Sequence, residues 1–186
     1  MNKTRQKTRD VAFTFRMGAG FAGDVNRTHP ASIEPVMIDS SAPPTFYGQP
    51  VLLGADSNSN YGARAFASGD QSNTVAAGYG ITVRPFPVQQ SSSGSNFGAA
   101  ALGAATPPTN GVVDVLRSGY IMVNLPNGGS PVKGGAVYVW AAASTGNHVL
   151  GGVEAAYSAG NTTQLLNATF NGSPDASGNV EVAFNI

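Results

Sequence analysis

The sequence predicts an all-β protein, a compact β-sandwich or β-barrel that follows an extended N-terminal arm. After Pro50, short runs of β-branched and aromatic residues recur every ~10–15 residues, a spacing typical of strands in sandwiches and barrels. Gly, Pro, Asn or Ser closes each run, and the chain has 24 glycines and 12 prolines. Apolar residues rarely recur with the period of an amphipathic helix, so helices are not expected.

Residues 1–50 are expected to form the arm and residues 51–186 the β-domain. The first nine residues carry four of the ten basic residues and, after Met1, no apolar one, so residues 1–10 are expected to be flexible. Val11–Phe15 alternates as a strand does. Proline fixes φ and removes a backbone donor, which excludes a helix or a central strand from the stretch that follows. Its prolines are Pro30, Pro35, Pro43, Pro44 and Pro50.

The β-domain is predicted to consist of short strands, of which eight are clearest in the sequence. The last of them shows one buried face, because Val180, Val182 and Phe184 alternate with polar or small residues. The expected strands are Ala63–Phe66, Tyr79–Val83, Val112–Leu116, Tyr120–Leu125, Ala136–Trp140, Val149–Leu150, Gln164–Leu165 and Val180–Phe184.

Composition excludes several classes of protein. Charged residues make up only 11% of the chain, and ten basic residues balance ten acidic ones, so a nucleic-acid-binding face is not expected. No apolar run approaches the ~18 residues of a membrane span. The chain has no cysteine, hence no disulfide and no thiolate metal site, which favours synthesis in a cytoplasm. No cofactor is expected.

Two short motifs imitate binding loops. Gly18–Gly23, with Asp39 further on, matches the dinucleotide fingerprint, but the residues after it cannot sustain the helix that the fingerprint requires. These glycines are expected instead to allow close backbone approach or positive φ. Asp56–Asn60 resembles the start of a calcium loop, yet Tyr61 and Ala67 occupy the positions that need Gly and Glu.

Catalytic residues do not group in the sequence. The two histidines, His29 and His148, lie far apart, and the acidic residues occur singly rather than in pairs. The sequence therefore predicts that the chain is not an enzyme. A hydrolase would require His29, His148 and acids to meet in one cleft.

Several long stretches resemble phage capsid decoration proteins, the family often labelled structural cement proteins. The similarity runs from Val11 to the C-terminus and leaves out the basic residues up to Arg9. The stretches that carry it are Phe15–Pro30, Gly80–Pro87, Asp114–Val123 and Val180–Ile186.

The resemblance implies a non-enzymatic virion protein that binds the outer surface of an icosahedral head and stabilises it by bridging major capsid protein subunits. A homo-oligomer is expected, with a trimer favoured and a dimer as the alternative, because cyclic symmetry matches local axes of the shell. Extended arms can add a strand to a neighbour's sheet, and polar side chains can anchor them. The candidate capsid-binding residues are Val11, Phe13, Phe15, Arg16, Arg27 and His29.

A module on the virion that binds carbohydrate or a host surface is the alternative interpretation. It would require exposed aromatic side chains in a shallow groove. The candidates are Tyr47, Tyr61 and Tyr157.

Overall fold

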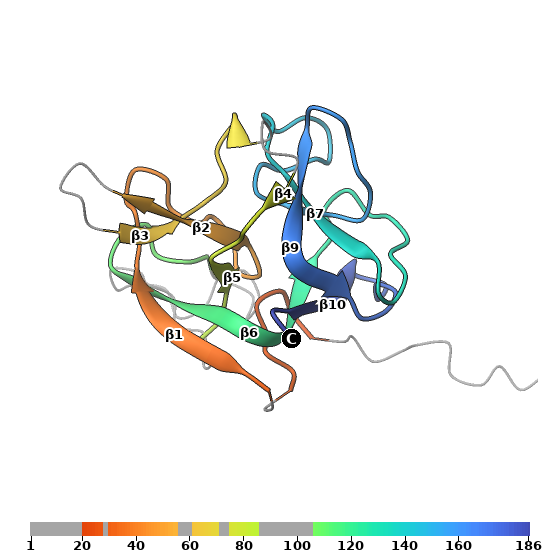
Figure 1. Cartoon of the computed structure of the whole chain (residues 1–186), viewed down its shortest axis with the longest axis horizontal. Helices are drawn as coiled ribbons and strands as arrows, with labels where there is room; N and C mark the ends of the chain where they lie inside the picture. Colours follow the sequence, from red (N-terminus) through yellow and green to blue (C-terminus); the bar gives the residue numbers. More distant parts are fainter. Residues whose placement is uncertain (1–19, 28–29, 56–60, 71–74, 86–105) are drawn as a thin grey trace, which may run out of the picture.

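The computed structural model describes residues 20–27, 30–55, 61–70, 75–85 and 106–186 (Figure 1). Over these residues the protein is all-β, as predicted, and has no α-helix. Accordingly, the described part of the chain has no helix long and apolar enough to cross a membrane. The strands are β1 (Ser32–Met37), β2 (Pro50–Ala55), β3 (Tyr61–Arg64), β4 (Val75–Ala76), β5 (Gly80–Thr82), β6 (Val112–Asn124), β7 (Ala136–Trp140), β8 (Val153–Glu154), β9 (Thr162–Phe170) and β10 (Asn179–Phe184).

Strand β6 organises the sheet because its two halves pair with different neighbours. Its first half pairs antiparallel with β1 and β5, and its second half with β10. Gly119 lies between the halves with a φ of +141°, a conformation that side chains disfavour. The strand order is β3-β2-β5-β6-β10-β9-β7-β8, while β1 pairs with β6 and β4 runs parallel to β9.

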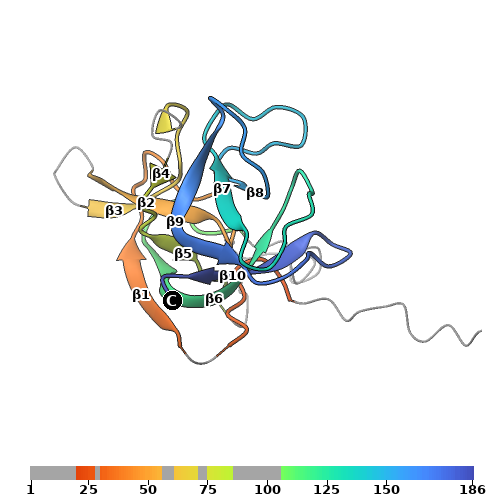
Figure 2. The ribbon, with the colours of Figure 1, turned by 45° about the vertical axis from the view of Figure 1, so that its right-hand side comes forward.

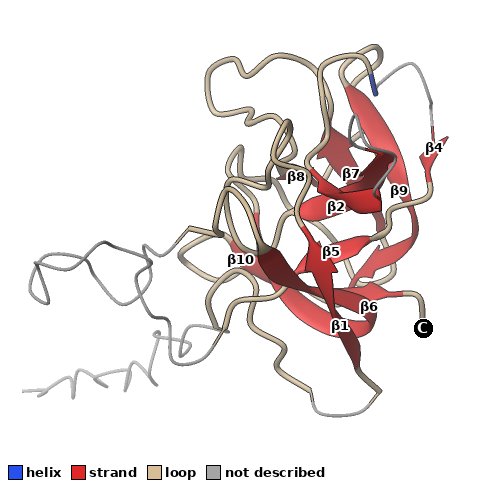
Figure 3. Cartoon of the chain, turned by 90° about the vertical axis from the view of Figure 1, so that its left-hand side faces the viewer, coloured by secondary structure: helices blue, strands red, loops and turns tan. Residues whose placement is uncertain are grey.

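Five strands curl into a small barrel. From β1 the order runs through β6, β5 and β2 to β3, and a parallel bridge between Ile38 and Ala63 brings β3 back to the end of β1. Four of these strands, β1, β6, β5 and β2, are labelled in Figure 3 and follow one another across the curved sheet. Small and β-branched side chains suit this narrow interior. It is filled by Ile38, Val51, Ala63, Val113 and Val115.

A larger core lies where the second half of β6 continues into β10, β9 and β7 (Figure 2). Along β10 the buried positions alternate, as the sequence predicts, so that Val180, Val182 and Phe184 point inward. The largest side chains in this core are fully buried and include Ile81, Leu116, Ile121, Leu165, Phe170 and Phe184.

The described part of the expected arm packs against its own β-domain. The Gly23 N–H donates to the Met122 C=O over 2.8 Å, and the Met122 N–H donates to the Asp24 C=O over 2.9 Å. Further along, β1 pairs with β6, and Tyr47 and Gln49 are buried. The boundary expected at residue 50 is therefore wrong for residues 20–27 and 30–50. Residues 1–19, including residues 1–10 and Val11–Phe15, lie outside the described residues.

The strand predictions were right where alternation was strong. β7 coincides with its predicted range, while Val112–Leu116 and Tyr120–Leu125 merge into β6. β1 and β2 were missed because each contains a proline. Val149–Leu150 is wrong, because it lies in the turn that leads into β8.

The glycine prediction is confirmed at Gly23. Its φ is +89°, and a Cβ there would lie 2.7 Å from the Tyr47 Cβ and 2.9 Å from the Arg84 nitrogen. The following described residues form no helix, so the dinucleotide motif has no phosphate-binding terminus. Asp39, its acidic partner in the motif, is buried and accepts hydrogen bonds from the Ser41 N–H and hydroxyl.

Candidate functional site

Three arginines in the described ranges share one arrangement, in which the guanidinium lies over an aromatic ring and beside a carboxylate. The distances from guanidinium carbon to ring centroid are 3.7–4.5 Å, within the range of cation–π contacts. The three groups are Arg27 with Tyr120 and Glu181, Arg84 with Phe21 and Asp24, and Arg117 with Tyr79 and Glu34.

Arg27 is the one sequence-predicted capsid-binding residue that the structure describes. Its guanidinium donates to both carboxylate oxygens of Glu181, over 3.0 and 2.7 Å, and lies 4.1 Å above the Tyr120 ring. These contacts hold the side chain to its own domain, and about half of it remains exposed. Its role as a polar anchor stays a prediction. The other five candidates lie outside the described residues: Val11, Phe13, Phe15, Arg16 and His29.

Glu181 holds this segment to β10. Burial opposes ionisation of the carboxyl, but hydrogen bonds from Arg27, Asn171 and Asn26 outweigh it, so its pKa lies below the ordinary value of 4.5. A carboxyl with a lowered pKa stabilises the folded state above its unfolded pKa. That stabilisation is lost as the pH falls through the folded pKa.

We expect Glu181→Gln to lower the Tm by about 2–4 °C at pH 7, a typical shift for one lost interaction in a domain of this size. As the pH falls below 4.5 toward the lowered folded-state pKa, the difference should shrink, because the Glu181 carboxyl of the unmodified protein becomes protonated. Thermal unfolding at pH 7 and pH 3 tests this. A difference that stays constant with pH would contradict the role assigned to the carboxylate.

An exposed apolar row follows β1 and the start of β6. Ile33, Pro35 and Met37 alternate along β1 and face solvent, and Val112 lies opposite Met37 in the ladder. Exposed fractions of 45% for Ile33, 58% for Met37 and 53% for Val112 are high for large apolar side chains side by side. Such patches mark contact surfaces. We call these four residues the β1 row.

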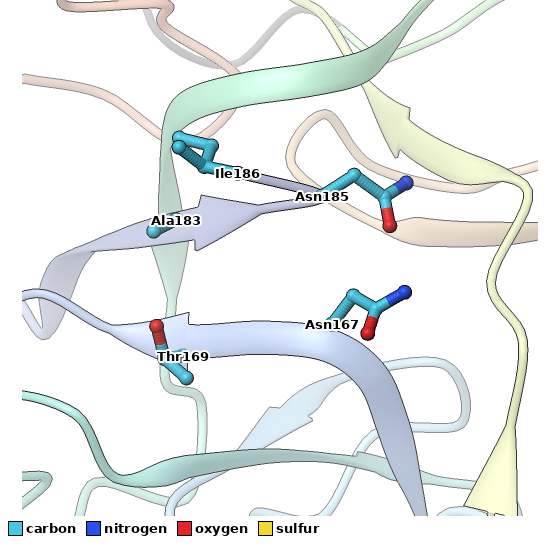
Figure 4. A pocket seen from close by; sticks show the side chains of 5 residues that line it. All are labelled: Asn167, Thr169, Ala183, Asn185 and Ile186. Atoms are coloured by element: carbon cyan, nitrogen blue, oxygen red, sulfur yellow. The ribbon is translucent and has the colours of Figure 1, made fainter.

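A shallow polar hollow of about 330 Å³ lies on the outer face of β9 and β10 (Figure 4). Thr169 and Ala183 face each other across the two strands, and the amides of Asn167 and Asn185 point to the same side. Ile186 completes the lining. No lining side chain carries a charge.

His148 lies in a separate cluster on the β7–β8 side. Its Nδ1 is 2.9 Å from Oε1 of the buried Glu154, and its ring stacks on Trp140 with 4.0 Å between centroids. This pair is a His–carboxylate unit, and its other carboxylate oxygen accepts from the Asn127 amide over 3.4 Å. His29 lies outside the described residues, which contain no group of three or more His, Asp or Glu that could hold a metal ion.

The three tyrosines of the alternative interpretation do not form one groove. Tyr47 is buried. Tyr61 lies in β3, while Tyr157 contacts Tyr138 of β7, with 5.9 Å between ring centroids. β3 and β7 lie near opposite ends of the strand order and on different sides in Figures 1 and 2.

Comparison with family models matches residues 11–184 to the family described as XM1 gp53 minor capsid protein. The chain belongs to this family. Membership supports a structural role in a phage capsid and agrees with the resemblance carried by the sequence. The match starts at residue 11, so it includes Val11–Phe15 and leaves out most of the basic leader.

A solved structure titled "The capsid of Myoviridae Phage XM1" contains a chain with the same fold as this minor capsid protein family member. The TM-score is 0.61 at 15% sequence identity, and the match covers 97% of this chain and 98% of that chain. At this identity the likeness concerns the fold. A comparison with curated proteins gives no match.

Proposed function

We propose that this protein is a capsid cement, or decoration, protein that binds the outer surface of a phage head and stabilises it by bridging neighbouring major capsid protein subunits. The observation that carries the proposal is the match of residues 11–184 to a minor capsid protein family. The protein acts by binding and not by catalysis. It is made in the host cytoplasm and joins the shell there.

The β1 row supports this function because a shell-binding domain needs an exposed apolar contact surface, and Asp114, opposite Pro35, adds a charge to it. The two cores make the domain rigid, and residues 1–16 are proposed to extend from it to a neighbouring subunit. Extended, the 16 leader residues span up to about 55 Å. Arg16 at the end of this leader, and Arg27 and His29 further along the chain, are proposed as polar anchors.

A trimer is the proposed oligomer. A shell presents many identical sites, so an oligomer engages several at once and weak single contacts suffice. Preference for the assembled shell then stabilises it by mass action.

Binding to heads that lack the protein tests the proposal. The purified protein should saturate mature heads at a fixed ratio and raise the temperature at which they release DNA. Double substitution of the β1 row, Met37→Glu with Val112→Glu, should weaken binding about 100-fold, because it buries two charges in an apolar contact.

Val132→Glu is the matched control, since Val132 is 67% exposed and lies outside the β1 row, in the connection between β6 and β7. It should bind normally. Equal binding of the double variant would remove the β1 row from the contact, and failure of the unmodified protein to bind any head would refute the proposed function.

A further inference from the structure

We propose that residues 11–15 of one copy add as an antiparallel strand to the free edge of β1 in the next copy of a cyclic oligomer. The inference names a partner, a second copy of this chain. The joint between copies does not depend on the proposed function. Only the role of the joined strands as a surface that contacts the shell rests on it.

The acceptor is the unpaired edge of β1. One side of β1 pairs with β6 over its whole length. β3 flanks the other side at the C-terminal end of β1, where Gly62 lies beside the Met37 C=O and the Asp39 N–H donates to the Ala63 C=O over 3.0 Å. The edge is open at Ile33 and Pro35. Across the described ranges no other strand pairs with β1. An exposed edge of this kind is a template for an added strand.

The ladder shows which backbone groups this edge offers. The C=O of Asp114 accepts from the Val83 N–H over 2.8 Å, so it points away from β1. Pro35 lies opposite Asp114 and has no N–H, so the two form a non-hydrogen-bonded pair. The backbone groups of Ile33 and Pro35 therefore face the free edge. They supply one donor, on Ile33, and two acceptors.

The pattern of Val11–Phe15 matches this edge. Phe15 placed opposite Ile33 exchanges two hydrogen bonds, and Phe13 opposite Pro35 donates a third. Opposed residues share a face, so the large side chains of the added strand extend the β1 row, while Ala12 and Thr14 point the other way. The opposed pairs are Phe15–Ile33 and Phe13–Pro35. Val11 ends the added strand where β3 begins to flank Met37.

The leader of the same chain is too short for this position. Gly20 is held beside Met122, and its C=O accepts from the Asn179 amide over 3.1 Å. Five residues back, Phe15 reaches at most about 17 Å. Ile33 pairs with Leu116, six residues or ~20 Å along β6 from Met122, and the added strand lies two strand spacings, ~10 Å, further out. A second copy can supply the strand without this limit.

The contact is heterologous, because a leader on one copy meets β1 on another. Such contacts close into a ring when the rotation allows it, which fits the proposed trimer. Each joint has few hydrogen bonds, so the ring depends on all its joints forming together.

Engineered cysteines test the joint cleanly because the natural chain has none. Two single variants, Phe15→Cys and Ile33→Cys, are mixed as free protein and oxidised. Opposed residues in a hydrogen-bonded pair have Cα atoms ~5.5 Å apart, within disulfide range. We expect a disulfide-linked heterodimer at least 10-fold above a control mixture of Phe15→Cys with Tyr157→Cys, since Tyr157 is exposed but lies beyond β8.

A heterodimer yield equal to the control would overturn the proposal. So would a double variant that forms its disulfide within one chain at high dilution, because the leader would then occupy its own β1. The experiment uses no heads, so its failure is separate from a failure of shell binding, which the Met37 and Val112 variants measure.

Discussion

Deleting residues 1–16 should abolish binding to heads and leave the β-domain folded. The deletion removes Val11, Phe13 and Phe15, the large apolar side chains of the leader, and Arg16. It spares Gly23 and Asp24, whose backbones bond to Met122, so the domain keeps its contacts. Loss of the links between copies removes an avidity gain of about 100-fold or more. Co-sedimentation with heads and a thermal melt measure the two effects.

A deletion of residues 2–9 is the matched control. It removes the basic residues that precede the family match but keeps Val11–Phe15. Four charges add little at physiological salt, so binding should change by no more than a few-fold. If the variant lacking residues 1–16 binds as tightly as this control, the leader has no role in attachment.

Gly80→Ala should destabilise the domain by about 3 kcal/mol, the upper range for an overpacked core. Gly80 lies in β5, between β2 and β6. An added Cβ would meet the Val115 side chain and lie 2.5 Å from the Leu116 C=O. Because the carbonyl belongs to the backbone, the clash can be relieved only if β5 moves away from β6. β6 is the strand that joins the small barrel to the larger core.

Gly172→Ala provides the comparison for that measurement. Its φ lies outside the positive range, and a Cβ there has no neighbour within 4 Å. Its free energy of unfolding should stay within about 0.5 kcal/mol of the unmodified protein in denaturant titrations. Equal effects of the two substitutions would show that the crowding at Gly80 is not what limits stability.

Much of the fold was predictable because apolar and polar residues alternate along a strand that has one buried face. β7 and β10 have strong period-two patterns and were found with nearly the observed bounds. β1 was missed because the prolines in and around it were interpreted as excluding a central strand, and the stretch was assigned to an extended arm. An edge strand accepts proline when its nitrogen faces away from the partner, and the direction of the Asp114 C=O shows that this holds here.

The surface residues were harder to predict because exposure depends on pairing between distant segments. Arg27 and Glu181 are 154 residues apart, and nothing local in the sequence links them. The β1 row depends on the β1–β6 register and on the exposure of Met37 and Val112, which no other described segment covers. The leader residues were identified from their own alternation, and their role remains a proposal.

A cryo-EM map of heads saturated with the protein tests the central claim most directly. The account predicts density for the β-domain on the outside of the shell, with the β1 row toward the capsid and each oligomer spanning at least two major capsid protein subunits. Density on the inner surface, or a domain that contacts a single subunit, would contradict it.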